Sequence, residues 1–392
     1  MRAVHWFRKG LRLHDNPALV EAVRQCGASS SPADACVYAV FVLDPWFVEE
    51  GGVGANRWRF LLESLADLHA QLEAAGSKLF VLQGRPEEVL PAFFAEQRVT
   101  LLTFEVDTEP YAVKRDSAIV ELAAEAGIAT EMRTSHTLFE PERLLARNQG
   151  KLPGSYATFC KLAGKSAVPP PVGSPLGGAA GASSSSSSSS SSASASAAAS
   201  AVGEGKADEP PFPSAGVAEA WAAGKHGVPS LADLGVDPAS EGAVAEAKFP
   251  GGEREALRRM RSYLARPAWI RAFEKPKTSP NTLEASTTVL SPYLKFGCLS
   301  PRLFYHELST VYAAGNGQHT KPPVSLHGQL LWREFYYVHG HHLGEAYGRM
   351  QGNSLCRQIP WAKNDAHLAA WTEGRTGYVP LYTCRCRRWF AA

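Results

Sequence analysis

Strand-like and helix-like segments alternate along residues 1–135, and this alternation restricts the chain to a few folds. The expected strands are 3–7, 37–43, 79–83, 101–105 and 129–133, and amphipathic helices are expected at 56–75, 86–96 and 110–126. Strands that alternate with helices of this length form a parallel sheet covered on both faces. Because a doubly wound sheet binds ligands beyond the carboxyl ends of its strands, the loops after Phe7, Leu43 and Glu105 are predicted to line any pocket.

The pattern changes after residue 135. Residues 174–209 include ten consecutive serines and have no apolar periodicity, which predicts a disordered insertion within a linker at 136–248. From residue 249 the pattern is helical, with helices expected at 253–264, 301–312, 326–342 and 365–373. The sequence therefore predicts an α/β N-terminal domain with a doubly wound parallel sheet, followed by an all-α domain over 249–378.

Charge is distributed unevenly along the chain. Residues 1–250 carry 21 Lys and Arg against 29 Asp and Glu, a net charge of −8, whereas residues 251–392 carry 19 against 9, a net charge of +10. This asymmetry predicts that the C-terminal part meets a polyanion, although an ordinary solvated basic surface would have the same composition.

Composition also limits which cellular compartments and which kinds of binding site are expected. Apolar runs fall well short of the roughly 20 residues of a membrane span, so no membrane partner is expected. The seven cysteines include no C-x-x-C pair, so neither a disulfide framework nor a metal site is expected. We therefore expect an intracellular protein.

Two stretches of the C-terminal part carry functional groups. Hydroxyls cluster at Thr287, Thr288 and Ser291, where they could donate hydrogen bonds to phosphate oxygens or cap a helix. In the second stretch, helical spacing places Gln329, Trp332 and Arg333 on one face, which could hydrogen-bond and stack on a base. The alternative is a core aromatic stripe with solvated Arg333 and Glu334.

Collinear stretches resemble one known family. They are WFRKGLRLHDNPAL at 6–19, VGANRWRFLLESLADL at 53–68, LTFEVDTEP at 102–110, FEKPKTSPN at 273–281, TTVLSPYLKFGCLSPRLFY at 287–305, GQLLWREFYY at 328–337, QIPWAKN at 358–364 and WTEGRTGY at 371–378. This text is similar to the photolyase/cryptochrome family, nearest to the (6-4) DNA photolyases and animal-type cryptochromes. The resemblance implies an antenna-type α/β domain and a helical domain that holds FAD.

The resemblance also assigns residues. It implies that the flavin phosphate-binding turn lies at Ser291, that Trp332 and Gln329 face a DNA lesion, and that Trp361 belongs to an electron-transfer chain. It further implies a second, antenna chromophore, a folate or a deazaflavin, in the N-terminal domain. The implied FAD-binding residues are Lys275, Thr287, Thr288, Leu290, Ser291, Gln329 and Arg333.

The implied activity is blue-light-driven repair of (6-4) pyrimidine photoproducts by electron transfer from reduced FAD. The alternatives are a cryptochrome-type photoreceptor without repair activity, with signalling proteins as partners, and an α/β module that binds a nucleotide or pterin with a vestigial helical extension. Residues 379–392 depart from the family pattern, so we expect a truncated chain with impaired repair. A monomer that binds ultraviolet-damaged DNA is expected in the nucleus, with the chloroplast and the cytoplasm as alternatives.

Overall fold

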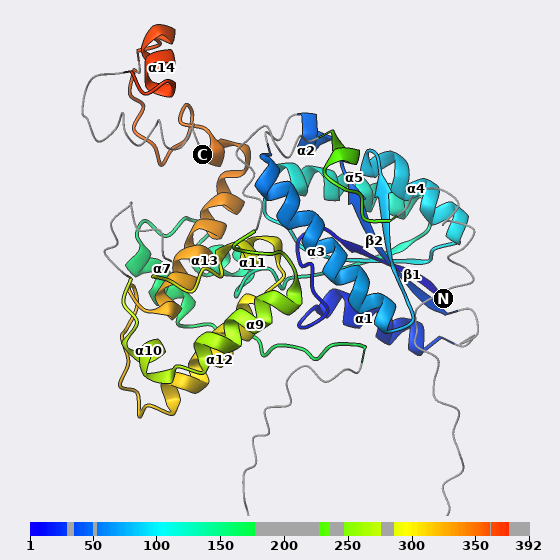
Figure 1. Cartoon of the computed structure of the whole chain (residues 1–392), viewed down its shortest axis with the longest axis horizontal. Helices are drawn as coiled ribbons and strands as arrows, with labels where there is room; N and C mark the ends of the chain where they lie inside the picture. The colour runs from blue at the N-terminus through cyan, green and yellow to red at the C-terminus, as the bar shows by residue number, and fades with distance from the viewer. Residues whose placement is uncertain are drawn as a thin grey trace, which may run out of the picture.

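The computed structural model describes residues 1–29, 35–49, 53–176, 227–235, 247–275, 286–360 and 362–375. Trp361, the serine-rich insertion from residue 177 and the tail at 379–392 lie outside these residues, so the predictions made for them stay predictions. Within the described residues, the molecule has an α/β part around one sheet and a second part built from helices (Figure 1).

The α/β part is built on a five-stranded parallel sheet with the order β3-β2-β1-β4-β5. This confirms the predicted doubly wound sheet, and the strand order reverses between β1 and β4. The strands are β1 (Arg2–Phe7), β2 (Cys36–Leu43), β3 (Leu79–Gln83), β4 (Leu101–Glu105) and β5 (Ala129–Arg133).

The two faces of the sheet pack into two separate cores because successive side chains of a strand point to opposite faces. Val4 and Trp6 of β1 join one core with buried residues of α4 (Pro86–Gln97) and α5 (Pro110–Glu125). Ala3 and Phe7 join the other core, which includes α1 (Pro17–Gly27) and α3 (Ala55–Ala74). Both faces are therefore covered by helices.

The second part contains only helices among the residues described from 247 to 375. They are α9 (Glu253–Leu264), α10 (Pro267–Ala272), α11 (Ser291–Phe296), α12 (Pro301–Ala313), α13 (Leu326–Leu343), the 3-10 helix η3 (Gly344–Gly348) and α14 (Asp365–Thr372). Buried residues of α9, α11, α12 and α13 belong to the same core cluster as Ala3 and Phe7. The helical part therefore shares one hydrophobic core with the sheet.

The segment after β5 also folds onto the helical part. Its helices α6 (Pro141–Arg147) and α7 (Tyr156–Ala163) both contact α13, although the sequence placed them within the linker. In Figure 1, α7 lies beside α13, while α14 projects beyond the body of the molecule. Among the described helices, none is both long and apolar enough to cross a membrane.

The loop after β1 joins the two parts through buried polar contacts. Arg12 donates to the carbonyl of Gly297 at 2.9 Å and pairs with Glu105 at 2.6 Å. Asp15 pairs with Arg302 of α12. Because these groups are almost fully buried, each charge requires its partner, and the contacts fix the helical part against the sheet.

Candidate functional site

The predicted phosphate-binding turn lies directly before and at the start of α11. Val289 has a φ of 49°, so the backbone turns sharply here. Leu290 and Thr288 are buried, while Thr287 and Ser291 are exposed. Within the described parts of the chain, the hydroxyls of Thr287, Thr288 and Ser291 form no hydrogen bond, so this donor set fits a phosphate group.

The second group of predicted residues lies on α13, which begins at the N-cap Ser325. The Gln329 side-chain amide approaches the carbonyl of Pro323 at 3.4 Å. Trp332 stacks on Tyr156 of α7, with ring centroids 3.9 Å apart and an angle of 11° between the planes. The indole is half-buried. It combines an aromatic face with access from solvent.

Arg333 points away from Trp332 and toward the segment after β5. Its guanidinium donates to the carbonyl of His136 at 2.8 Å and to the carbonyl of Leu294 in α11 at 3.4 Å, and it pairs with Glu334 at 2.8 Å. Arg333 thereby holds α11 beside α13. The structure thus brings the phosphate-binding turn and the α13 residues onto neighbouring helices, but it does not place Arg333 on the same face as Trp332.

Glu334 is a buried residue whose role the sequence pattern did not indicate. Only 2% of its surface is exposed, and it accepts a hydrogen bond of 2.7 Å from the amide of Leu138. Burial raises the pKa of Glu334 to about 7, although the neighbouring Arg333 opposes this shift. The reading of Glu334 as a solvated residue was therefore wrong.

Lys275 lies near the start of α13. Its backbone amide donates to the carbonyl of Val324 at 2.9 Å, and its side chain is exposed. This contact places residue 275 next to the N-terminus of the helix that carries Gln329. The ammonium group is available to an anionic ligand, in keeping with its predicted role, which stays a prediction.

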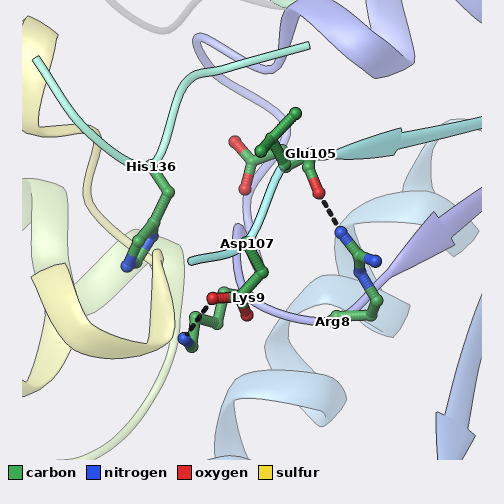
Figure 2. Close-up of a pocket in the computed structure, with 6 residues that line it drawn as sticks. Arg8, Lys9, Glu105, Asp107 and His136 are labelled. Carbon is green, nitrogen blue, oxygen red and sulfur yellow. Dashed lines mark hydrogen bonds and ion pairs between the residues drawn. The ribbon is translucent and has the colours of Figure 1, made fainter. Parts of the chain in front are cut away.

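A narrow polar crevice lies where the strand order reverses, at the carboxyl ends of β1 and β4. Figure 2 shows the side chains that line it, which come from the loop after β1, from the end of β4 and the loop that follows it, and from the segment after β5. Lys9 pairs with Asp107 at 2.8 Å and with Glu109 at 2.9 Å. Of the three loops predicted to line a pocket, those after Phe7 and Glu105 line this crevice, whereas the loop after Leu43 does not.

His136 connects this crevice to α13. Its Nε2 atom accepts hydrogen bonds from the Tyr337 hydroxyl at 2.8 Å and from Arg333 at 3.1 Å. Burial, reinforced by the positive charge of Arg333, lowers the pKa of His136 well below its usual value. The ring is therefore neutral and acts as an acceptor between two donors.

Two buried polar atoms beside this crevice lack a hydrogen-bond partner in the described part of the chain. The Nδ1 atom of His136 and the Oε2 atom of Glu105 are buried and have no hydrogen-bond partner within the described structure. The second chromophore predicted for the N-terminal domain stays a prediction. No cluster of His, Cys, Asp and Glu suited to a metal ion occurs in the described ranges.

Comparison with known families identifies both parts of the chain. The sequence model described as DNA photolyase matches residues 3–175. The model described as the FAD binding domain of DNA photolyase matches residues 325–381, which include α13. Cryptochrome-1 of Rattus norvegicus is 43% identical over 378 residues, which cover 96% of this chain and 57% of the rat protein. The chain thus spans just over half the length of this relative.

Solved structures share the fold at low sequence identity. A cryptochrome from Synechocystis superposes with a TM-score of 0.71 at 22% identity, covering 98% of this chain and 70% of that one. A class III photolyase from Agrobacterium tumefaciens superposes with a TM-score of 0.68 at 22% identity, covering 99% and 69%. This chain therefore shares its fold with a protein named a cryptochrome and with one named a photolyase.

A parallel α/β domain that matches the DNA photolyase model shares its core with a helical domain that includes the match to the FAD-binding model. Together these features define the class of photolyase-fold proteins. The chain belongs to the photolyase/cryptochrome family. This confirms the resemblance seen in the sequence.

Proposed function

We propose that this chain binds FAD at the turn before α11, recognises ultraviolet-damaged DNA through α13, and serves the light-driven repair of (6-4) photoproducts. The observation that carries the proposal is the proximity of α11 and α13, which are joined by the contact between Arg333 and the Leu294 carbonyl. Because of this contact, a turn rich in free hydroxyls and a half-buried indole lie on neighbouring helices.

Each residue has a separate task in this proposal. Thr287, Thr288 and Ser291 donate hydrogen bonds to the phosphates, and the Lys275 ammonium adds positive charge. The Gln329 amide hydrogen-bonds to a base edge or to the flavin, and Trp332 stacks on a base that has left the helix. When bound, reduced FAD supplies the electron that light drives to the pyrimidine photoproduct. The protein binds and orients both partners.

A cryptochrome-type photoreceptor is the second candidate. It is favoured by the 43% identity to the rat protein named cryptochrome-1, which covers nearly the whole of this chain. Its partners would be signalling proteins instead of damaged DNA. An α/β module that acts alone has less support, because α9 to α13 share one core with the sheet.

The test combines FAD binding and damage recognition on the full chain. FAD fluorescence is titrated with protein, and Ser291→Ala combined with Thr288→Val is expected to weaken binding severalfold because phosphate donors are lost. Binding to a duplex that carries one (6-4) photoproduct is then compared with binding to the same duplex without it, in the wild type and in Trp332→Ala. A preference for the lesion that Trp332→Ala reduces, and repair under blue light, support the photolyase. FAD binding without any lesion preference favours the cryptochrome.

A further inference from the structure

We infer that Tyr156 is a positioning residue that holds the Trp332 indole ready to stack on an unpaired base. This inference rests on the proposed function of Trp332 as the residue that faces the lesion. Tyr156 lies on α7, in the segment that the sequence assigned to the linker. It therefore links the folding of that segment to the shape of the binding surface.

The geometry of the two rings is that of direct stacking. Their centroids are 3.9 Å apart and their planes differ by 11°, so one face of the Trp332 indole is covered by the Tyr156 ring. Tyr336, one helical turn further along α13, lies 5.9 Å from the indole and is 54% exposed. The three rings form a continuous aromatic surface that extends from α7 to solvent.

Tyr156 is itself fixed at its hydroxyl end. The hydroxyl donates to the carbonyl of Gly328 at 3.1 Å, and Gly328 lies one helical turn before Trp332. A side chain at Gly328 would overlap the backbone of Pro323, so this part of α13 is tightly packed and offers a fixed acceptor. Burial and the neighbouring Cys160 raise the pKa of Tyr156, which keeps the hydroxyl protonated as a donor at neutral pH.

The ring of Tyr156 is also supported from its edge. Phe335 lies 6.1 Å away in an edge-to-face arrangement, and Phe159 of the same helix lies 6.4 Å away. A half-buried indole without such support would sample several rotamers, and a ligand would have to select one of them. Holding the side chain in place before binding reduces the entropy lost on binding and so increases affinity.

The test uses two substitutions at this position and one matched control, all in the full chain. Tyr156→Phe keeps the stacked ring and loses only the hydrogen bond to Gly328. Tyr156→Ala loses the ring. The control is Tyr305→Ala, because Tyr305 of α12 stacks on His327 with centroids 4.2 Å apart and planes 10° apart, and this pair does not include Trp332.

Two readouts are needed, and the first does not involve DNA. For the wild type and for each variant, a matching protein that also carries Trp332→Phe gives the fluorescence of the other tryptophans. Subtracting its signal leaves the fluorescence of Trp332, whose anisotropy and quenching by acrylamide are then obtained. Tyr156→Ala is expected to lower the anisotropy and raise the quenching constant, whereas Tyr156→Phe stays near the wild type and Tyr305→Ala has no effect on Trp332. The second readout is the ratio of affinities for (6-4)-damaged and undamaged duplex, which Tyr156→Ala is expected to lower by roughly 2- to 10-fold.

The outcomes separate this inference from the proposed function. Unchanged Trp332 fluorescence in Tyr156→Ala overturns the inference, as does a lesion preference that survives in Tyr156→Ala but is lost in Trp332→Ala. If Trp332→Ala itself leaves the lesion preference unchanged, the proposed function is wrong, while the fluorescence still decides whether Tyr156 positions the indole. Recovery of both readouts in Tyr156→Phe supports a role for the ring in positioning the indole.

Discussion

The carboxylate of Glu334 accepts a hydrogen bond from the backbone amide of Leu138 at 2.7 Å and so connects α13 to the segment that follows β5. The same carboxylate pairs with Arg333, whose guanidinium contacts His136 and Leu294. Glu334 therefore lies at the junction of the α/β part, α11 and α13. Its ionisation should affect the stability of the whole molecule.

The pH dependence of this contribution can be predicted. Burial raises the pKa of Glu334 from 4.5 to about 7, so between these pH values the folded protein keeps a proton that the unfolded chain releases. The contribution of Glu334 to the free energy of unfolding is therefore greatest below pH 4.5 and decreases as the pH rises to about 7. Glu334→Gln cannot ionise. Its stability relative to the wild type should rise between pH 5 and pH 8 by about 3 kcal/mol, measured by chemical denaturation.

The control for this prediction is Glu345→Gln, because the Glu345 carboxylate is 71% exposed in its pair with Arg349. Its substitution should change stability by less than about 1 kcal/mol, because exposed ion pairs contribute little. A Glu334→Gln difference that stays constant between pH 5 and pH 8 would contradict the buried, proton-binding state of Glu334.

The close approach of Gly297 to Gly10 gives a second prediction. Gly297 has a φ of 69°, and a Cβ there would overlap the backbone of Gly10 in the loop after β1. Gly317 has a similar φ of 73° but open space around it. Gly297→Ala should therefore destabilise the protein by about 2 kcal/mol more than Gly317→Ala, because only the first combines strain with overlap. Thermal unfolding of the two variants measures the difference. Equal losses of stability would show that the Gly10 loop moves to make room for the Cβ at residue 297.

A third prediction concerns Glu253, the first residue of α9. It accepts hydrogen bonds from the amides of Leu13 and His14 at 2.8 and 2.9 Å and pairs with the His14 ring. Burial acts to raise the pKa of Glu253, but His14 and the two amides outweigh it and lower the pKa overall. The stabilisation is therefore present above pH 4.5 and is lost as the pH falls through the lowered pKa.

Glu253→Ala leaves two buried amides without an acceptor and should cost about 3 kcal/mol at neutral pH. The matched control is Glu255→Ala on the same helix, whose carboxylate pairs with Arg258 and Arg259 nearer to solvent and should contribute less than about 1 kcal/mol. Urea denaturation at pH 7 and at pH 4 measures both variants. If Glu253→Ala lowers the free energy of unfolding equally at both pH values, stability does not depend on the ionisation of Glu253.

Regular periodicity explains why much of the fold could be predicted from the sequence. The five strands and α9 were placed within one residue of their observed bounds, since apolar spacing marks them directly. Helix α1 was missed, although Asn16 caps it and Pro17 begins it, because two of its four buried residues are alanines, which give a weak apolar signal. The helices α6 and α7 were assigned to the linker because they have only 7 and 8 residues, too few for a clear helical period.

Contacts between distant residues could not be predicted in this way. The partner of His14 is Glu253 and that of Asp15 is Arg302, and nothing in the local sequence pairs them. Tyr156 carries no motif, and its stacking on Trp332 arises only when α7 folds onto α13. The resemblance to the family assigned roles to α13, but the burial of Glu334 depends on the segment after β5.

The final prediction concerns DNA binding by the basic part of the chain. Residues 251–392 have a net charge of +10, and within the described structure neither Arg261 nor Lys321 pairs with a carboxylate. Both side chains are exposed. Phosphates would release condensed counterions when they meet such groups, so affinity for undamaged duplex should fall steeply between about 50 and 200 mM salt.

Substitution at these residues tests whether the charge asymmetry has this function. Arg261→Glu and Lys321→Glu should each weaken binding to damaged and undamaged duplex alike and reduce the slope of log affinity against log salt by about 1, because each removes one expected phosphate contact. The control is Lys114→Glu, which makes the same change of charge on an exposed residue of α5, in the part of the chain with a net charge of −8. Fluorescence polarisation with a labelled duplex over a salt series gives the slopes. If Lys114→Glu weakens binding as much as the other two variants, affinity for DNA depends on the net charge of the whole chain. The basic part would then not be the DNA-binding surface.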